Sequence, residues 1–207
     1  MNRLLLIPSV LLASFGFATQ AFAHPISYAG HTWSTYQATG HLGQIWRPSQ
    51  VSVQGSTLIE RINGNVAGGI GSKSYQTYGT YNATFRFSAG AGKMVMGIYG
   101  HTLHQEIDFA ETPKRDPQRS TMTATLHWSH ANHMQHFKVS GDFTQWHTVQ
   151  LQWKPGLLVF LMDGKEFGRT TTHVPNFPMH PAIQTAGANI AGWGAPAQLE
   201  VSNFTIS

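Results

Sequence analysis

The chain has 207 residues, of which 11% are charged and 12% are aromatic, and it carries a formal net charge of +4 with no cysteine. A chain of this length can bury a sizeable core. The aromatic content and the lack of long charge runs exclude a disordered tail protein. The missing cysteine excludes disulfide scaffolds, thiolate metal sites and cysteine catalysis. Basic residues are scattered along the sequence, so we expect no nucleic-acid partner.

Residues 1–23 have the features of a secretory signal peptide. Arg3 gives a positive start, residues 4–12 form an interrupted apolar run, and residues 21–23 read Ala-Phe-Ala, which suits a signal peptidase. The apolar run is shorter than the ~20 residues that span a bilayer. We therefore expect residues 24–207 to form one exported domain, periplasmic or secreted, that is a monomer and makes no membrane contact.

Alternation of apolar and polar residues predicts strands in the exported part of the chain. Three stretches show it with a period of two, which places one face of each on a core: residues 81–87, 121–128 and 148–153. A continuous apolar run at 157–162 ends at Asp163-Gly164, a dipeptide typical of hairpin turns. The last stretch, 199–206, changes phase near Ser202, which predicts a β-bulge. With helix signals nearly absent, the pattern favours an all-β sandwich or barrel of antiparallel sheets.

Acidic residues are scarce, yet three of the nine in the chain fall within six positions. Ile107 and Phe109 alternate with Glu106 and Asp108, so a strand would put both carboxyl groups on the face opposite the two apolar side chains. Glu111 would point the other way in a regular strand. One extra residue just before Glu111, a β-bulge, would return it to the face of Glu106. The sequence therefore predicts three carboxyl groups on one surface.

Two carboxyl groups on one surface suit glycoside hydrolysis. Retaining glycosidases need a nucleophile and an acid/base about 5–5.5 Å apart, and Glu106 and Glu111 on a bulged strand could meet this spacing. Crowding should raise at least one pKa, and Asp108 could hydrogen-bond Glu106. The alternatives are a solvated polar edge or a structural calcium site, although calcium loops are usually rich in Gly and Asn. We expect no other cofactor.

Two histidine patterns raise the alternative of a metal site. After cleavage His24 would be the N-terminal residue, as in copper-dependent polysaccharide monooxygenases. Four histidines also recur at every third position, which on a helix would form a metal-binding face: His127, His130, His133 and His136. Residues 129–135 have the composition of a loop, however, so we favour a cleft lining and predict no metal.

The acidic stretch resembles a known enzyme family. Residues 106–111, Glu-Ile-Asp-Phe-Ala-Glu, are similar to the E-x-D-x-x-E signature of glycoside hydrolase family 16, which includes laminarinases, lichenases and agarases. Further similar segments follow the family's order: QTYGTY at 76–81, TLHW at 125–128, GDFTQWHT at 141–148, WKPG at 153–156 and MDGK at 162–165. The resemblance covers most of residues 33–207.

The resemblance implies a concanavalin-like jelly roll of two curved antiparallel sheets, with a substrate cleft on the concave face. It implies retaining, endo-acting hydrolysis of β-glycosidic bonds in a polysaccharide, with β-1,3- or mixed-linkage β-1,3-1,4-glucan as the first expectation. By motif position, Glu106 is the nucleophile, Asp108 its helper and Glu111 the acid/base. A non-catalytic lectin-like domain and a transglycosylase on the same fold remain the alternatives.

Six further residues are expected to contact the sugar, on the resemblance and on their aromatic or polar character: Trp46, Tyr99, His127, Trp128, Gln184 and Trp193. Residues 92–105 depart from the family, since many members carry tryptophan there and this chain has none. We expect Tyr99, His101 and His104 to line the site instead, and the usual glucan specificity is open.

Overall fold

The computed structural model describes residues 21–39, 43–90, 92–101, 105–113, 116–129, 133–187 and 196–207. This part of the chain is built from strands, with one short 3₁₀ helix, η1 (Pro48–Gln50). The strands are β1 (Ala21–Tyr28), β2 (His31–Thr39), β3 (Ile45–Trp46), β4 (Val51–Gln54), β5 (Thr57–Asn63), β6 (Val66–Ala67), β7 (Gly69–Ser72), β8 (Gly79–Phe87), β9 (Lys93–Tyr99), β10 (Glu106–Glu111), β11 (Thr121–Trp128), β12 (His133–Ser140), β13 (His147–Lys154), β14 (Leu157–Met162), β15 (Lys165–Thr170), β16 (His180–Ala186) and β17 (Ala197–Ile206).

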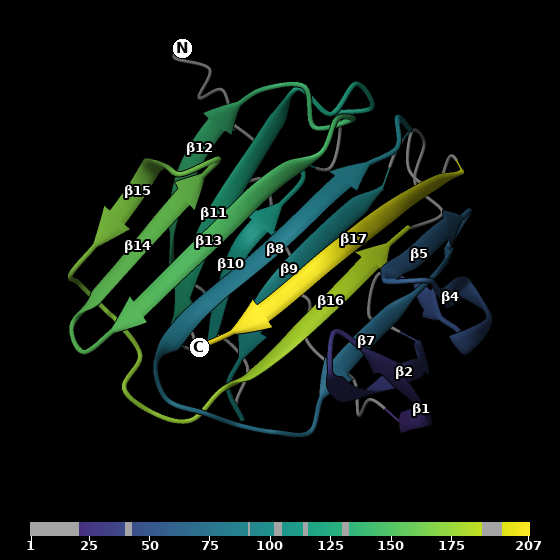
Figure 1. Ribbon diagram of the computed structural model, residues 1–207, viewed down its shortest axis with the longest axis horizontal. Helices are drawn as coiled ribbons and strands as arrows, with labels where there is room; N and C mark the ends of the chain where they lie inside the picture. The colour runs from purple at the N-terminus through teal and green to yellow at the C-terminus, as the bar shows by residue number, and fades with distance from the viewer. Residues whose placement is uncertain are drawn as a thin grey trace, which may run out of the picture.

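The strands form two layers that lie face to face (Figure 1). In the first sheet the order is β1-β2-β7-β16-β9-β10-β11-β12, and all neighbours are antiparallel. In the second it is β4-β5-β17-β8-β13-β14-β15, again antiparallel. Strand β2 pairs with β7 of the first sheet and with the short strand β3, which connects through β6 to β5. The two layers are therefore joined along one edge by backbone hydrogen bonds.

The core lies between the layers, as the alternation predicts. Along β8, Tyr81, Ala83, Phe85 and Phe87 are at most 1% exposed, and the polar residues between them lie on the other face. The expected bulge in the last strand is confirmed, because Val201 lies opposite Phe85 and the next pair skips Ser202. The all-β prediction is thus confirmed in its class and in its inward-facing residues.

The predicted hairpin at Asp163-Gly164 is also present. Met162 pairs with Lys165, so the turn has two residues, and both have positive φ, 50° for Asp163 and 76° for Gly164. This is the backbone shape that matches the twist of the flanking strands and that the Asp-Gly pair adopts at low cost.

One sequence expectation about the β11–β12 connection is wrong. Residues 129–135 were expected to form a loop, but β12 begins at His133, which pairs with Trp128 of β11. This strand is at the edge of the first sheet, and only Phe137 and Val139 of its residues pack against the core, so its apolar alternation is short. His127 lies on β11, and His133 and His136 lie on β12, so these three histidines lie on strands rather than on a helix, whereas His130 lies outside the described residues.

Of the predicted signal peptide, residues 21–23 begin β1, and residues 1–20 lie outside the described residues. Among the described residues, no helix is long and apolar enough to cross a membrane.

Replacing Phe85 with alanine tests the core. Phe85 is fully buried and packs against Phe87 and Phe143, with ring centroids 5.1 and 6.4 Å away. Phe85→Ala should lower the free energy of unfolding by about 3–5 kcal/mol, because it leaves a cavity in a rigid core. Urea denaturation followed by tryptophan fluorescence measures the change. A loss below about 1 kcal/mol would contradict this account of the core.

Candidate active site

The predicted bulge in β10 decides where the three carboxyl groups lie. Opposite β11, Asp108 pairs with Thr125 and Glu111 with Thr123, so three steps along β10 match two along β11. Opposite β9 the register also shifts after Asp108. The extra residue brings Glu111 back to the face of Glu106 and Asp108, while Ile107 and Phe109 enter the core. The three carboxyl groups lie on the outer face of the first sheet, yet side chains of neighbouring strands leave them 1–7% exposed.

At one end of this row, hydrogen-bond donors surround Glu111. Lys93, at the start of β9, forms an ion pair with its Oε1, and both side chains are buried. Thr125 Oγ1 donates to Glu111 Oε2 at 2.7 Å and lies 3.0 Å from Nδ1 of His136. Thr123 Oγ1 lies 3.4 Å from the same Glu111 oxygen. Glu111 is therefore positioned by β9 and β11 together.

At the other end, Glu106 and Asp108 share a site with His127. One ligand-type atom from each of the three lies within 4.8 Å of the others. His127 Nε2 is 3.4 Å from Asp108 Oδ2, and the hydroxyl of Tyr99 is 3.3 Å from Oδ1 of the same residue. Gln184 Nε2 donates to the Tyr99 hydroxyl at 2.8 Å. Strands β16, β9 and β11 thus fix Asp108, which in turn lies against Glu106.

The two glutamates differ in their electrostatic environments. Burial and the adjacent Asp108 raise the pKa of Glu106 well above its ordinary value. Burial also acts to raise the pKa of Glu111, but the Lys93 ammonium and its hydrogen bond outweigh this and lower it. Burial would lower the pKa of His127, but Asp108 and Glu106 raise it to about 9. The crowding inferred from the sequence thus acts mainly on Glu106.

The grouping of Glu106, Asp108 and His127 has the spacing of a divalent-metal site. The same carboxyl groups favour the charged form of His127, whose Nε2 lies 3.4 Å from Asp108 Oδ2. We therefore interpret His127 as an ionic partner of Asp108, and we assign no metal on the spacing alone.

The structure divides the expected sugar contacts into three groups. Tyr99 and Gln184 are buried: Gln184 donates a hydrogen bond to the Tyr99 hydroxyl, and this hydroxyl donates one to Asp108. His127 contacts Asp108 directly. Trp128 is half-buried and lines an open hollow next to the carboxyl groups. Trp193 and His104 lie outside the described residues.

The expectation for Trp46 is corrected by its position. It is 2% exposed, packs edge-on against Tyr36 and donates its indole N–H to the carbonyl of Thr185 at 2.9 Å. A tryptophan with its ring in the core and its polar atom satisfied has no face to offer a sugar. Trp46 therefore stabilises the sandwich instead of contacting substrate.

Exposed rings flank Glu106 on both sides across the strands. On the β11 side, Trp128 stacks on His173 with ring centroids 4.3 Å apart, beside a hollow of about 250 Å³ that His127 also lines. On the β9 side, Tyr75 stacks on His101 at 4.4 Å and contacts His180. Tyr75 is 41% exposed. Flat rings of this kind can stack on the apolar faces of sugars.

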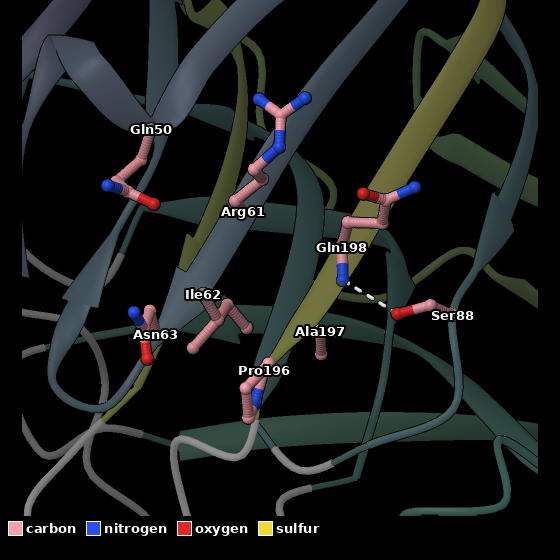
Figure 2. A pocket seen from close by; sticks show the side chains of 8 residues that line it. All are labelled: Gln50, Arg61, Ile62, Asn63, Ser88, Pro196, Ala197 and Gln198. Carbon is pink, nitrogen blue, oxygen red and sulfur yellow. Dashed lines mark hydrogen bonds between the residues drawn. The ribbon is translucent and has the colours of Figure 1, made fainter.

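A second hollow, of about 380 Å³, lies between β5 and β17 (Figure 2). It is lined by amide and basic side chains, including those of Arg61 and Gln198, and the backbone N–H of Gln198 donates to Ser88 Oγ at 2.7 Å. Its lining residues include neither a carboxyl group nor a histidine. This second hollow shares no residue with the three carboxyl groups on β10 and has no group suited to acid/base catalysis. The candidate active site is therefore placed at the three carboxyl groups.

Sequence reasoning missed Lys93, Tyr75 and His173. Lys93 reaches Glu111 because β9 and β10 pair with Val95 opposite Glu111, a register that no local pattern in the sequence reveals. Tyr75 and His173 come from connections between strands, and only the fold brings them beside His101 and Trp128.

Comparison with known proteins identifies the family of the chain. The family model of glycosyl hydrolases family 16 matches residues 39–201. The chain belongs to this family. A comparison with curated protein sequences gives no match. As a family 16 domain, the chain is a glycoside hydrolase by membership, and its two-layered sheet is the family's jelly-roll sandwich.

Solved structures show the same fold at low sequence identity. A family 16 endo-glucanase from Bacteroides ovatus has a TM-score of 0.71 at 17% identity, covering 84% of this chain and 94% of that one. An endo-β-1,3-glucanase from Pyrococcus furiosus has 0.71 at 14%, covering 88% and 97%. A κ-carrageenase from Zobellia galactanivorans has 0.64 at 13%, covering 78% and 82%. Proteins named for different polysaccharides thus share this sandwich, so the fold does not identify the substrate.

Gly97 of this family 16 domain gives a test of the site's packing. A Cβ there would lie 2.6 Å from Asp108 Oδ1 and 2.9 Å from the Tyr99 hydroxyl, so Gly97→Ala must displace Asp108. A misplacement near 1 Å in an active site can cost about 10²-fold in rate, and we expect a loss of this order together with a loss of about 1–3 kcal/mol in stability from the overpacked contact. Gly141→Ala is the matched control, because its Cβ would meet Phe143 at an ordinary 3.4 Å. Equal activity of the two variants would contradict this assignment.

The pair of His127 and Asp108 predicts a pH-dependent stability. The pKa of folded His127 is about 9 against an ordinary 6.5, so the pair stabilises the fold fully below pH 6.5 and loses its effect as pH rises through 9. The free energy of unfolding should therefore fall over this range more steeply in the wild type than in His127→Gln. Urea denaturation across the range measures both slopes. Parallel slopes would show that His127 is not held as an imidazolium.

Proposed function

We propose that the chain is an exported, endo-acting glycoside hydrolase that cleaves internal β-glycosidic bonds of a polysaccharide with retention of configuration. Residues 1–23 would direct its export. The observation that carries the proposal is the bulged strand β10, which gathers Glu106, Asp108 and Glu111 on one face among groups that set their protonation. A retaining reaction needs two carboxyl groups and one proton between them.

The roles follow from chemistry and from the family's motif order. Glu106 attacks the anomeric carbon as a carboxylate, while Glu111 gives its proton to the leaving oxygen as that bond breaks. Water then attacks the glycosyl ester, Glu111 takes the water's proton, and Glu106 is released. Asp108 acts beside Glu106: the two carboxyl groups lie close together, and Asp108 is itself held by its contacts with His127 and Tyr99.

The placement of the exposed rings supports an endo-acting cleft. The Trp128–His173 and Tyr75–His101 stacks lie on opposite sides of Glu106 across the strands, so a sugar chain crossing the sheet would meet a flat ring before and after the bond that is cut. A β-1,3- or mixed-linkage glucan is the proposed substrate, in keeping with the names of the Bacteroides and Pyrococcus structures. A galactan is the alternative, because residues 92–105 hold none of the tryptophans that many family members carry there, and the first assay should include it.

Two other functions use the same surface. A lectin-like domain would bind glycan without cutting it, but it has no need for three buried carboxyl groups whose crowding costs stability. A transglycosylase would use the same covalent intermediate and a sugar acceptor in place of water. The product assay below distinguishes the two reactions, because a transglycosylase would form longer oligosaccharides in place of new reducing ends.

The activity is tested by incubating the mature chain with a panel of β-glucans and galactans and measuring released reducing ends. Wild type should release them, Glu106→Gln should release none, and Glu111→Gln should lose about 10²–10⁴-fold. Glu166→Gln, an exposed glutamate paired with Arg169, is the matched control and should keep full activity. Early products followed by proton NMR should be β-anomers. α-Anomers would rule out retention, and binding without release would favour the lectin.

A further inference from the structure

The environment of Glu111 in the free protein is one of donors alone. Lys93 contacts Oε1, and Thr125 donates to Oε2. Thr125 Oγ1 also lies 3.0 Å from Nδ1 of His136, and the tautomer of the ring decides which of the two atoms donates. The Lys93 ammonium can only donate, so its contact with Oε1 favours a Glu111 carboxylate over a protonated Glu111.

Glu106 has the opposite environment. It is 5% exposed, and one ligand-type atom of its carboxyl group lies within 4.8 Å of one from Asp108 and one from His127. Two buried carboxyl groups this close together are costly to ionise at the same time. The Tyr99 hydroxyl donates to Asp108 Oδ1 and His127 Nε2 lies 3.4 Å from Oδ2, so Asp108 has the partners that favour a carboxylate, and Glu106 is the better holder of a proton, in agreement with its raised pKa.

We propose that Lys93 is a positioning residue which keeps Glu111 as a carboxylate in the free protein, so that the single proton of the Glu106–Glu111 pair rests on the nucleophile. This inference rests on the proposed function for its catalytic meaning. The arrangement is the reverse of the one that starts the reaction, which needs Glu106 ionised and Glu111 protonated.

Lys93 is singled out from every charged or titratable group that faces Glu111. These are Lys93 from β9, Glu106 and Asp108 from β10 itself, His127 from β11, and His136 and Lys138 from β12. Lys93 alone among them is in direct contact with the Glu111 carboxyl group. Both partners have side chains at most 10% exposed, so solvent screens their attraction weakly.

The consequence is an uneven effect on the two chemical steps. Cleavage of the glycosidic bond has to use the minor form in which the proton has moved from Glu106 to Glu111, and Lys93 lowers the population of that form. Hydrolysis of the glycosyl ester needs Glu111 as a base, which is the form that Lys93 stabilises. Lys93 thus slows cleavage of poor leaving groups and favours the second step.

The first experiment measures the protonation directly and needs no substrate. The chain has five glutamates, so carbon-13 labelling of their carboxyl groups gives few resonances, and Glu106→Gln and Glu111→Gln assign the two of interest. In the wild type, Glu111 should titrate below Glu106. In Lys93→Met its midpoint should rise by about one pH unit or more, while Lys93→Arg and the exposed-lysine control Lys154→Met should leave it low. A wild-type Glu111 that titrates above Glu106, or an unchanged midpoint in Lys93→Met, would overturn the proposal.

The second experiment measures the effect on each step. Cleavage of a 2,4-dinitrophenyl β-laminaribioside needs no proton from Glu111, whereas cleavage of a polysaccharide does. In Lys93→Met the ratio of kcat/KM for the polysaccharide to that for the aryl glycoside should rise by about tenfold for each unit that the Glu111 midpoint moves. A fall of both rates together would mean a merely structural Lys93 and would overturn the proposal. Failure of the wild type on every glycan would count against the proposed function, and the titration would then still decide the role of Lys93.

Discussion

The rest of the site depends on one constraint, the single extra residue in β10. It places three carboxyl groups on one face of a buried strand, and like charges at that density are tolerated only with compensation. The compensation is local. Lys93 from β9 forms an ion pair with Glu111, His127 from β11 lies beside Asp108, and burial with the adjacent Asp108 raises the pKa of Glu106. The residues that balance the row therefore come from the strands on both sides of β10.

This arrangement divides the row into two ends with different chemical characters. Glu111 lies against the Lys93 ammonium and the Thr125 hydroxyl, whereas Glu106 lies in a group with the Asp108 carboxyl and His127. Two glutamates five positions apart in the sequence thus lie in environments that move their pKa values in opposite directions. Paired groups separated in this way are what acid/base chemistry at neutral pH requires.

Much of the sandwich was predictable, because alternation along a strand reports directly which face is buried. The alternation at 81–87, the turn at Asp163-Gly164 and the two bulges all follow from local sequence. The partners of the carboxyl groups were not predictable in the same way. Lys93 and Gln184 reach the site through the register of strands far apart in the chain, and register depends on the whole sheet. The role of Trp46 was misjudged because the residues around it in the sequence do not show that its ring is buried. They also do not show that its indole N–H bonds to the carbonyl of the distant Thr185.

The two edges of the sandwich are held together by different means. On one edge β2 hydrogen-bonds with β7 of one layer and β3 of the other, so the layers share a continuous backbone ladder there. On the opposite edge β12 meets the second layer through side chains, with Phe137 against Phe160 and the Gly168 backbone. The position of β12 relative to the second layer therefore depends on the packing of one aromatic side chain rather than on backbone hydrogen bonds. Because β12 carries His136, this packing also fixes the contact that runs from His136 through Thr125 to Glu111.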